Sequence, residues 1–116
     1  MIYYTLLTTS SFNVGEAVQH NGSTLEPHTT GEVCGVVMSC ASLNDEGTEY
    51  ETKVYVAGGG GITVSLGAAW NGQPTRFEFV NGRATPAPTG GDGWLIPEYP
   101  LSAKVAGDTA HAAIYR

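Results

Sequence analysis

The sequence contains little charge and few basic residues. Lysine and arginine together number 5 against 11 acidic residues, which gives the 116-residue chain a formal net charge of -6. A nucleic-acid partner normally requires a basic stripe, because contacts to phosphate dominate that affinity. The five basic residues are scattered along the chain, so we expect no direct binding to nucleic acid.

Long apolar runs and helical periodicity are also missing. The segment from Met1 to Leu7 has a short apolar run, without a basic leading region and without the length of a membrane span. We expect it to be a strand or an arm, and not a targeting signal. No window sustains the 3.6-residue period of an amphipathic helix, which predicts little or no helix. No membrane partner is expected.

Cysteine is scarce, with Cys34 and Cys40 as the two thiols. On one extended strand they would lie about 20 Å apart, at roughly 3.3 Å per residue, so they are not expected to pair with each other. Two unpaired thiols favour a reducing compartment such as a cytoplasm. Their simplest role is that of small core residues.

What the chain has in quantity is the composition of short strands and turns. Hydrophobic residues make up 41% of the sequence, with 16 glycines and 6 prolines. Ile62, Val64 and Leu66 alternate with polar residues, which is the pattern of a half-buried strand. Strands are predicted at Ala17 to His20, Val33 to Ser39, Lys53 to Ala57, Ile62 to Leu66, Arg76 to Val80, Trp94 to Ile96 and Ala110 to Tyr115.

The turn residues indicate a weak internal repeat. Asn21 with Gly22 and Asn81 with Gly82 are predicted tight turns 60 positions apart, each followed by a proline-containing stretch, an apolar strand, a turn and a closing strand. We predict residues 1–13 as an N-terminal arm or first strand. Residues 14–116 are predicted to form a single β domain, with repeat units at about 14–57 and 70–114 joined by a flexible run at Gly58 to Gly61. The expected fold is all-β, a compact sandwich or barrel built from two similar β halves.

No arrangement of residues predicts catalysis, a cofactor or a metal. His20, His28 and His111 lack the spacing that would bring two of them onto one metal ion. The acidic cluster from Asp45 to Glu51 lacks the dense ligand spacing of calcium loops, and we expect a solvated loop. With no pair of nucleophile and base, we predict that the chain is not an enzyme. An uncharacterised enzyme subunit is the least favoured hypothesis and ranks third, after the two that are given below.

The order of turns and alternating strands resembles the small β-rich capsid decoration (cement) proteins of tailed bacteriophages. The residues that carry the resemblance are Gly15-Glu-Ala-Val18, Asn21-Gly-Ser-Thr-Leu-Glu-Pro27, Gly31-Glu-Val-Cys-Gly-Val-Val37 and Lys53-Val-Tyr-Val56, with a looser second copy at Asn81-Gly-Arg-Ala-Thr-Pro86 and Gly107-Asp108. The resemblance covers about residues 14 to 114. The four-glycine run, the two tryptophans and the long acidic turn depart from the family pattern, which leaves the oligomeric state and the attachment surface open.

The resemblance implies a structural, non-enzymatic protein that binds the major capsid protein on the outside of a phage head and stabilises the shell. It also implies a virion location after synthesis in the host cytoplasm, and a homotrimer. A trimer seated over a local threefold position would bury surface on several shell subunits at once.

The N-terminal segment is the expected contact, either as an arm that adds a strand to the shell protein or, alternatively, as an ordinary strand of this chain's own sheet. The capsid-contact candidates are its apolar and aromatic residues, Ile2, Tyr3, Tyr4, Leu6 and Leu7.

A second hypothesis is a carbohydrate-binding or receptor-binding β module of a phage fibre. Its site would be an exposed aromatic surface, for which the candidates are Trp70, Trp94 and Tyr99. Exposed tryptophan and tyrosine would also suit a protein interface. An exposed platform formed by the two tryptophans would favour this hypothesis, whereas a flexible N-terminal arm would favour the first.

Overall fold

Short strands follow one another along the chain, as the alternating sequence predicts. The computed structural model describes residues 2–29, 32–57 and 61–114. Among these residues the first half contains β1 (Ile2–Thr8), β2 (Ala17–Asn21), β3 (Thr24–Pro27), β4 (Gly35–Ser42) and β5 (Tyr50–Ala57). The second half contains β6 (Ile62–Ser65), β7 (Thr75–Val80), β8 (Arg83–Pro86), β9 (Gly93–Ile96) and β10 (Thr109–Ile114). The predicted all-β fold class is confirmed.

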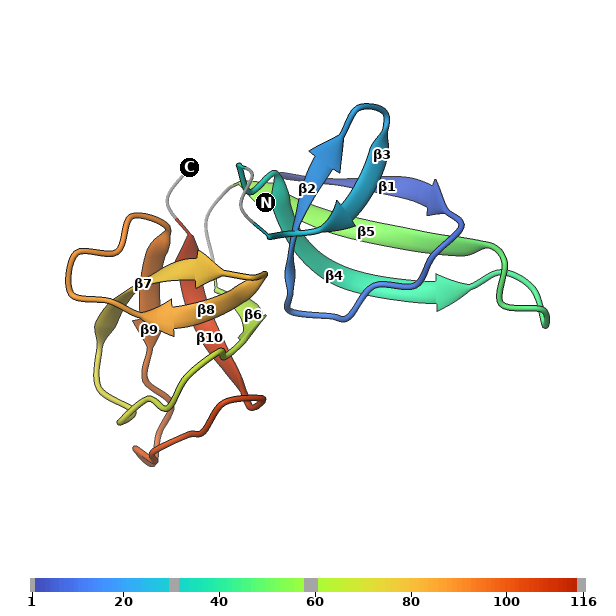
Figure 1. The fold of residues 1–116 in the computed structure, drawn as a ribbon. Helices are drawn as coiled ribbons and strands as arrows, with labels where there is room; N and C mark the ends of the chain where they lie inside the picture. Colours follow the sequence, from blue (N-terminus) through green and yellow to red (C-terminus); the bar gives the residue numbers. More distant parts are fainter. Residues whose placement is uncertain (1, 30–31, 58–60, 115–116) are drawn as a thin grey trace.

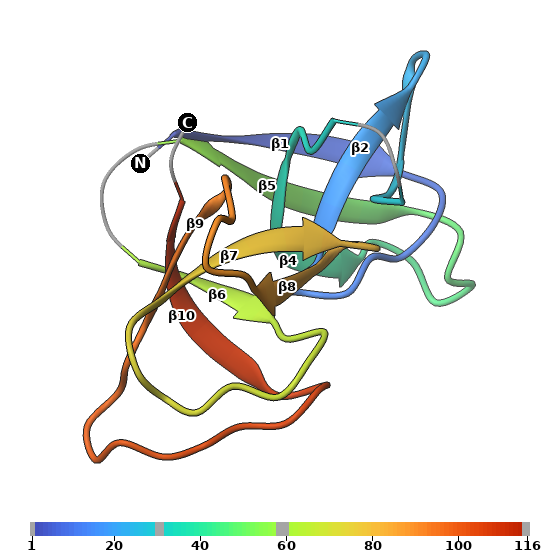
Figure 2. The same cartoon turned by 60° about the vertical axis from the view of Figure 1, so that its left-hand side comes forward.

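Each half of the chain forms its own five-stranded antiparallel sheet (Figure 1). The strand order of the first sheet is β1-β5-β4-β2-β3, and that of the second sheet is β6-β10-β9-β7-β8. Adding five to each strand number of the first sheet gives the second, so the two sheets have the same topology. Figure 1 shows the two sheets as separate lobes that meet along one side, and in the turned view of Figure 2 strands β7 and β8 of the second sheet overlap the first sheet.

Both Asn-Gly sequences lie at two-residue hairpin turns, but the position of the turn relative to the Asn-Gly pair differs by one residue between them. Asn21 pairs with Thr24, so Gly22, with a φ of 66°, is the first of two turn residues. Val80 pairs with Arg83, so Asn81 and Gly82 are the turn residues, with φ values of 50° and 79°. One positive φ at the first position is typical of a type II′ turn, and two are typical of type I′.

The larger hydrophobic core joins the two lobes. It contains Ala17, Val36 and Tyr55 from the first half together with most of the buried residues of the second half. A smaller cluster of Val18, Val37 and Val54 lies within the first lobe. Because side chains alternate across a strand, Val36 and the adjacent Val37 belong to different clusters.

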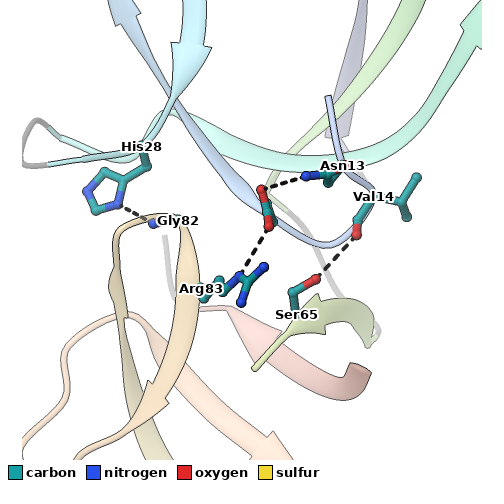
Figure 3. Close-up of polar contacts among 7 residues, drawn as sticks. Asn13, Val14, His28, Ser65, Gly82 and Arg83 are labelled. Carbon is teal, nitrogen blue, oxygen red and sulfur yellow. Dashed lines mark hydrogen bonds and ion pairs between the residues drawn. The ribbon is translucent and has the colours of Figure 1, made fainter. Parts of the chain in front are cut away.

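A polar seam completes the contact between the halves (Figure 3). The backbone N–H of Ala17 donates to the carbonyl of Gly82 at 2.7 Å, and the N–H of Gly82 donates to Nδ1 of the buried His28 at 3.0 Å. The N–H of Ser65 donates to the carbonyl of Gly15 at 2.8 Å. The turn at Gly82 is therefore fixed from both sides by the first half.

The second sheet closes on itself, because its two edge strands meet. Leu66, directly after β6, forms a parallel bridge with Ala84 of β8, and the N–H of Gly67 donates to the carbonyl of Ala84 at 2.9 Å.

The described part of the chain has no helix with the length and apolarity that a membrane span requires. The predicted flexible join at Gly58 to Gly61 falls largely on residues outside those described, as do the last two residues of the predicted domain.

Candidate functional site

The longest edge strand in the described part of the chain is β1. This strand lies at the end of the first sheet, and its described residues pair with β5 alone. It has seven residues, Ile2–Thr8, and none is charged or a proline. The other edge strands, β3, β6 and β8, have four residues each. Both β3 and β8 end in proline, which removes one backbone N–H at that end of the strand, and β8 is joined to the end of β6.

The structure places the predicted contact segment in the chain's own sheet, and not in a free arm. Ile2, Tyr3 and Leu7 are 60%, 50% and 78% exposed. Tyr4 and Leu6 are half-buried, so the predicted set is divided between an outer and an inner surface. Nζ of Lys53 lies 5.9 Å from the ring centre of Tyr3, which holds this exposed ring against the neighbouring strand.

A groove of about 230 Å³ lies beside the end of β1. Its walls are the end of β1, the following loop, the turn between β2 and β3, and the start of β3. The lining residues are Leu6, Leu7, Thr8, Thr9, Ser10, Phe12, Ser23, Thr24 and Leu25. All of these side chains are uncharged, and the polar ones are hydroxyl groups. The groove is therefore suited to an uncharged, partly apolar ligand.

Tyr4 attaches the middle of β1 to the rest of the first lobe. Its hydroxyl lies 3.5 Å from Nε2 of His20 and 3.6 Å from Sγ of Cys34. Burial raises the pKa of Tyr4, and the contact with Cys34 raises it further. The phenol therefore stays protonated well above neutral pH. This cluster anchors β1 to the neighbouring strands by hydrogen bonding.

The predicted aromatic platform is not formed. Trp70 was expected to be exposed, and this expectation is wrong: the side chain is 4% exposed and its Nε1–H donates to the carbonyl of Gln73 at 2.8 Å. The physical reason is a backbone bridge between Trp70 and Lys104, which draws the indole into the larger core. Trp94 is 37% exposed and Tyr99 98% exposed. An exposed surface made by both tryptophans is therefore excluded.

The three histidines lie in different settings. His20 contacts Tyr4, His28 is buried against the Gly82 turn, and His111 is exposed on β10 with Nε2 3.8 Å from Oε1 of Glu98. Within residues 2–29, 32–57 and 61–114, no three side chains of His, Cys, Asp or Glu are grouped to hold a metal ion.

The predicted acidic cluster, Asp45, Glu46, Glu49 and Glu51, lies on the loop before β5 and at the start of that strand. Thr48 in this loop donates its N–H to Oδ1 of Asn44 at 3.1 Å, which shapes the turn.

Sequence reasoning missed the side of the groove that lies opposite β1. Phe12, Ser23 and Leu25 line it, although they lie outside the predicted contact set. The sequence did contain a signal for this wall, because the predicted turn at Asn21 and Gly22 implies a returning strand beyond it.

Comparison with protein-family models, with curated proteins and with solved structures finds no match.

Proposed function

We propose that this chain is a structural, non-enzymatic protein that binds a larger protein assembly through β1. The observation that carries the proposal is the free edge of β1, which has seven residues without charge or proline and carries three exposed apolar or aromatic side chains. Such edges are normally protected against pairing by charge, proline or short length. An edge without these protections is suited to strand addition by another protein.

The chemistry of β1 fits a contact that excludes water. Strand addition satisfies the unpaired backbone groups of both partners, while Ile2, Tyr3 and Leu7 remove apolar surface from water. The chain carries a net charge of -6, yet none of this charge lies on β1. Binding through β1 therefore avoids the cost of burying an unpaired charge.

The proposed assembly is the outer surface of a phage head, and the major capsid protein is the proposed partner. The support for this setting is the sequence resemblance to capsid decoration proteins. In that setting the chain would reach the virion exterior after synthesis in the host cytoplasm, and would stabilise the shell by bridging its subunits.

Binding to capsids tests the proposal. Heads assembled from the major capsid protein encoded with this chain, and lacking the chain itself, would be sedimented with increasing amounts of purified protein. We expect saturable binding, and calorimetry of the decorated heads should show a higher shell-disruption temperature. Absence of binding at micromolar protein would contradict the proposal.

A homotrimer is part of the same proposal, because a trimer can contact several shell subunits around a threefold position. Light scattering on the purified protein at several concentrations measures this directly. The expected mass is three times the 12.1 kDa of one chain. A single-chain mass at every concentration, on and off the head, would refute the trimer while leaving binding through β1 in place.

A further inference from the structure

The two lobes can be compared residue by residue, because their strands pair in the same way. In the first sheet Val36 pairs with Tyr55, directly after Gly35; in the second Trp94 pairs with Ala113, directly after Gly93. One residue earlier along the last strand, Val54 pairs with Tyr4, and Ala112 pairs with Ile62. By this register Tyr4, Leu6 and Thr8 of the first lobe correspond to Ile62, Val64 and Leu66 of the second.

These corresponding residues differ in burial. Ile62, Val64 and Leu66 are buried, whereas Tyr4, Leu6 and Thr8 are half-buried. The opposite edge shows the same contrast. The pairing of Phe77 with Pro86 and of Val18 with Pro27 makes Ala84 the counterpart of Leu25, and Ala84 is buried while Leu25 is half-buried.

Corresponding residues differ in burial because the second lobe is closed and the first lobe is open. In the second lobe the strand ends meet at the bridge between Leu66 and Ala84. The corresponding place in the first lobe lies between Thr8 and Leu25, and both of these residues line the 230 Å³ groove. The first lobe is thus an open form of the barrel that the second lobe closes.

We propose that an extended segment of the partner protein inserts between β1 and β3 and closes the first lobe as an additional strand. This inference rests on the proposed function and names how the partner is held. The occupant is a polypeptide, because the groove lies between the edge strands β1 and β3, whose outer backbone groups another extended backbone can pair with. Its inserted residues are uncharged and include at least one apolar side chain, since the groove lining is uncharged and partly apolar.

The size of the groove agrees with an inserted side chain. A cavity of about 150 Å³ accommodates a benzene molecule, and the groove is larger. A second copy of this chain is a less suitable occupant. Its own extended uncharged strand, β1, is paired with β5 along its whole length and would have to leave that sheet.

Hydrogen exchange on the intact protein, free and bound to capsids, tests the insertion. We expect the backbone amides of both β1 and β3 to exchange at least tenfold more slowly in the bound state. The amides of β6 and β8 serve as the internal control and should be unchanged. Ser23→Arg places a charge at the groove wall and should weaken capsid binding at least tenfold, whereas Thr89→Arg, on an exposed turn of the second lobe, should leave binding unchanged.

The outcomes separate the two proposals. Binding with slower exchange in β1 alone would overturn insertion and leave the proposed function standing. Binding that protects neither edge would overturn both proposals, and so would the absence of binding to capsids. Slower exchange in β1 and β3 on concentrating the free protein would assign the groove to a second copy and overturn the inference.

Discussion

At the scale of single residues, Gly35 and Gly93 occupy corresponding positions in the two lobes, and each lies in close contact with the neighbouring strand of its own sheet. A Cβ atom on Gly93 would collide with the carbonyl of Ala113, and one on Gly35 would collide with Val54 and with the carbonyl of Tyr55. Backbone atoms in paired strands cannot move away without breaking the ladder. These glycines are therefore required by close approach and not by a positive φ.

We predict that Gly93→Ala lowers the free energy of unfolding by about 1–3 kcal/mol, the usual cost of overpacking. Urea denaturation of the purified variant measures the change. Gly91→Ala is the matched control, because a Cβ there meets nothing within 4 Å. Equal midpoints for the two variants would contradict the packing account.

Tyr4 gives the molecule a predicted sensitivity to alkaline pH. Its pKa in the folded protein is raised above the usual value near 10, chiefly by burial. The folded state then holds this proton more tightly than the unfolded state. Stability from this group is fully present below about pH 10 and is lost as the pH rises further.

Tyr4→Phe should therefore lose less stability than the wild type between about pH 9 and pH 12. Thermal unfolding at several pH values in this range measures the slope. Tyr99→Phe, at a side chain that is 98% exposed, should follow the wild type. Parallel curves for Tyr4→Phe and the wild type would refute the role assigned to Tyr4.

At the scale of elements, the turn between β7 and β8 depends on His28 (Figure 3). Nδ1 of His28 accepts the Gly82 N–H at 3.0 Å in a buried setting. His28→Leu would leave this donor without that acceptor, at a cost of about 1–3 kcal/mol of stability. His28→Asn retains a side-chain acceptor near the same position and should cost less. Chemical denaturation ranks the two variants, and equal losses would contradict the acceptor role.

The strands that sequence reasoning identified are those with strong alternation. Ile62 to Leu66 and Arg76 to Val80 differ from the observed β6 and β7 by one residue at one end. The sequence predicts the returning strands β3 and β8 only as proline-containing stretches. They are strands because tight turns bring them back against β2 and β7, and their prolines stand last in an edge strand, where a missing N–H is tolerated.

Tertiary contacts decided the features that the sequence did not predict. Trp70 carries no local sign of burial, and its position depends on a bridge to Lys104, 34 residues away in the sequence (104 - 70). The groove likewise requires β1 and the β2–β3 turn to approach each other in space. Composition and alternation predict strands and turns, but not which strand edges meet.

At the scale of the whole molecule, two lobes of one topology have different edges. The second lobe is closed by its own strands, and its described edge strands are short. The first lobe presents the long uncharged strand β1 and the groove beside it. In the proposed function the first lobe carries the binding edge, and the larger core attaches it to the closed second lobe.

In the proposed function the free edge of β1 carries binding. The most direct measurement is the affinity for capsids of Leu7→Lys, compared with Leu101→Lys as a matched control on another exposed leucine. A lysine on an edge strand opposes strand addition without disturbing an exposed site. We expect at least a tenfold loss of affinity for Leu7→Lys and wild-type affinity for Leu101→Lys. Wild-type affinity for Leu7→Lys, or an equal loss for both variants, would contradict binding through β1.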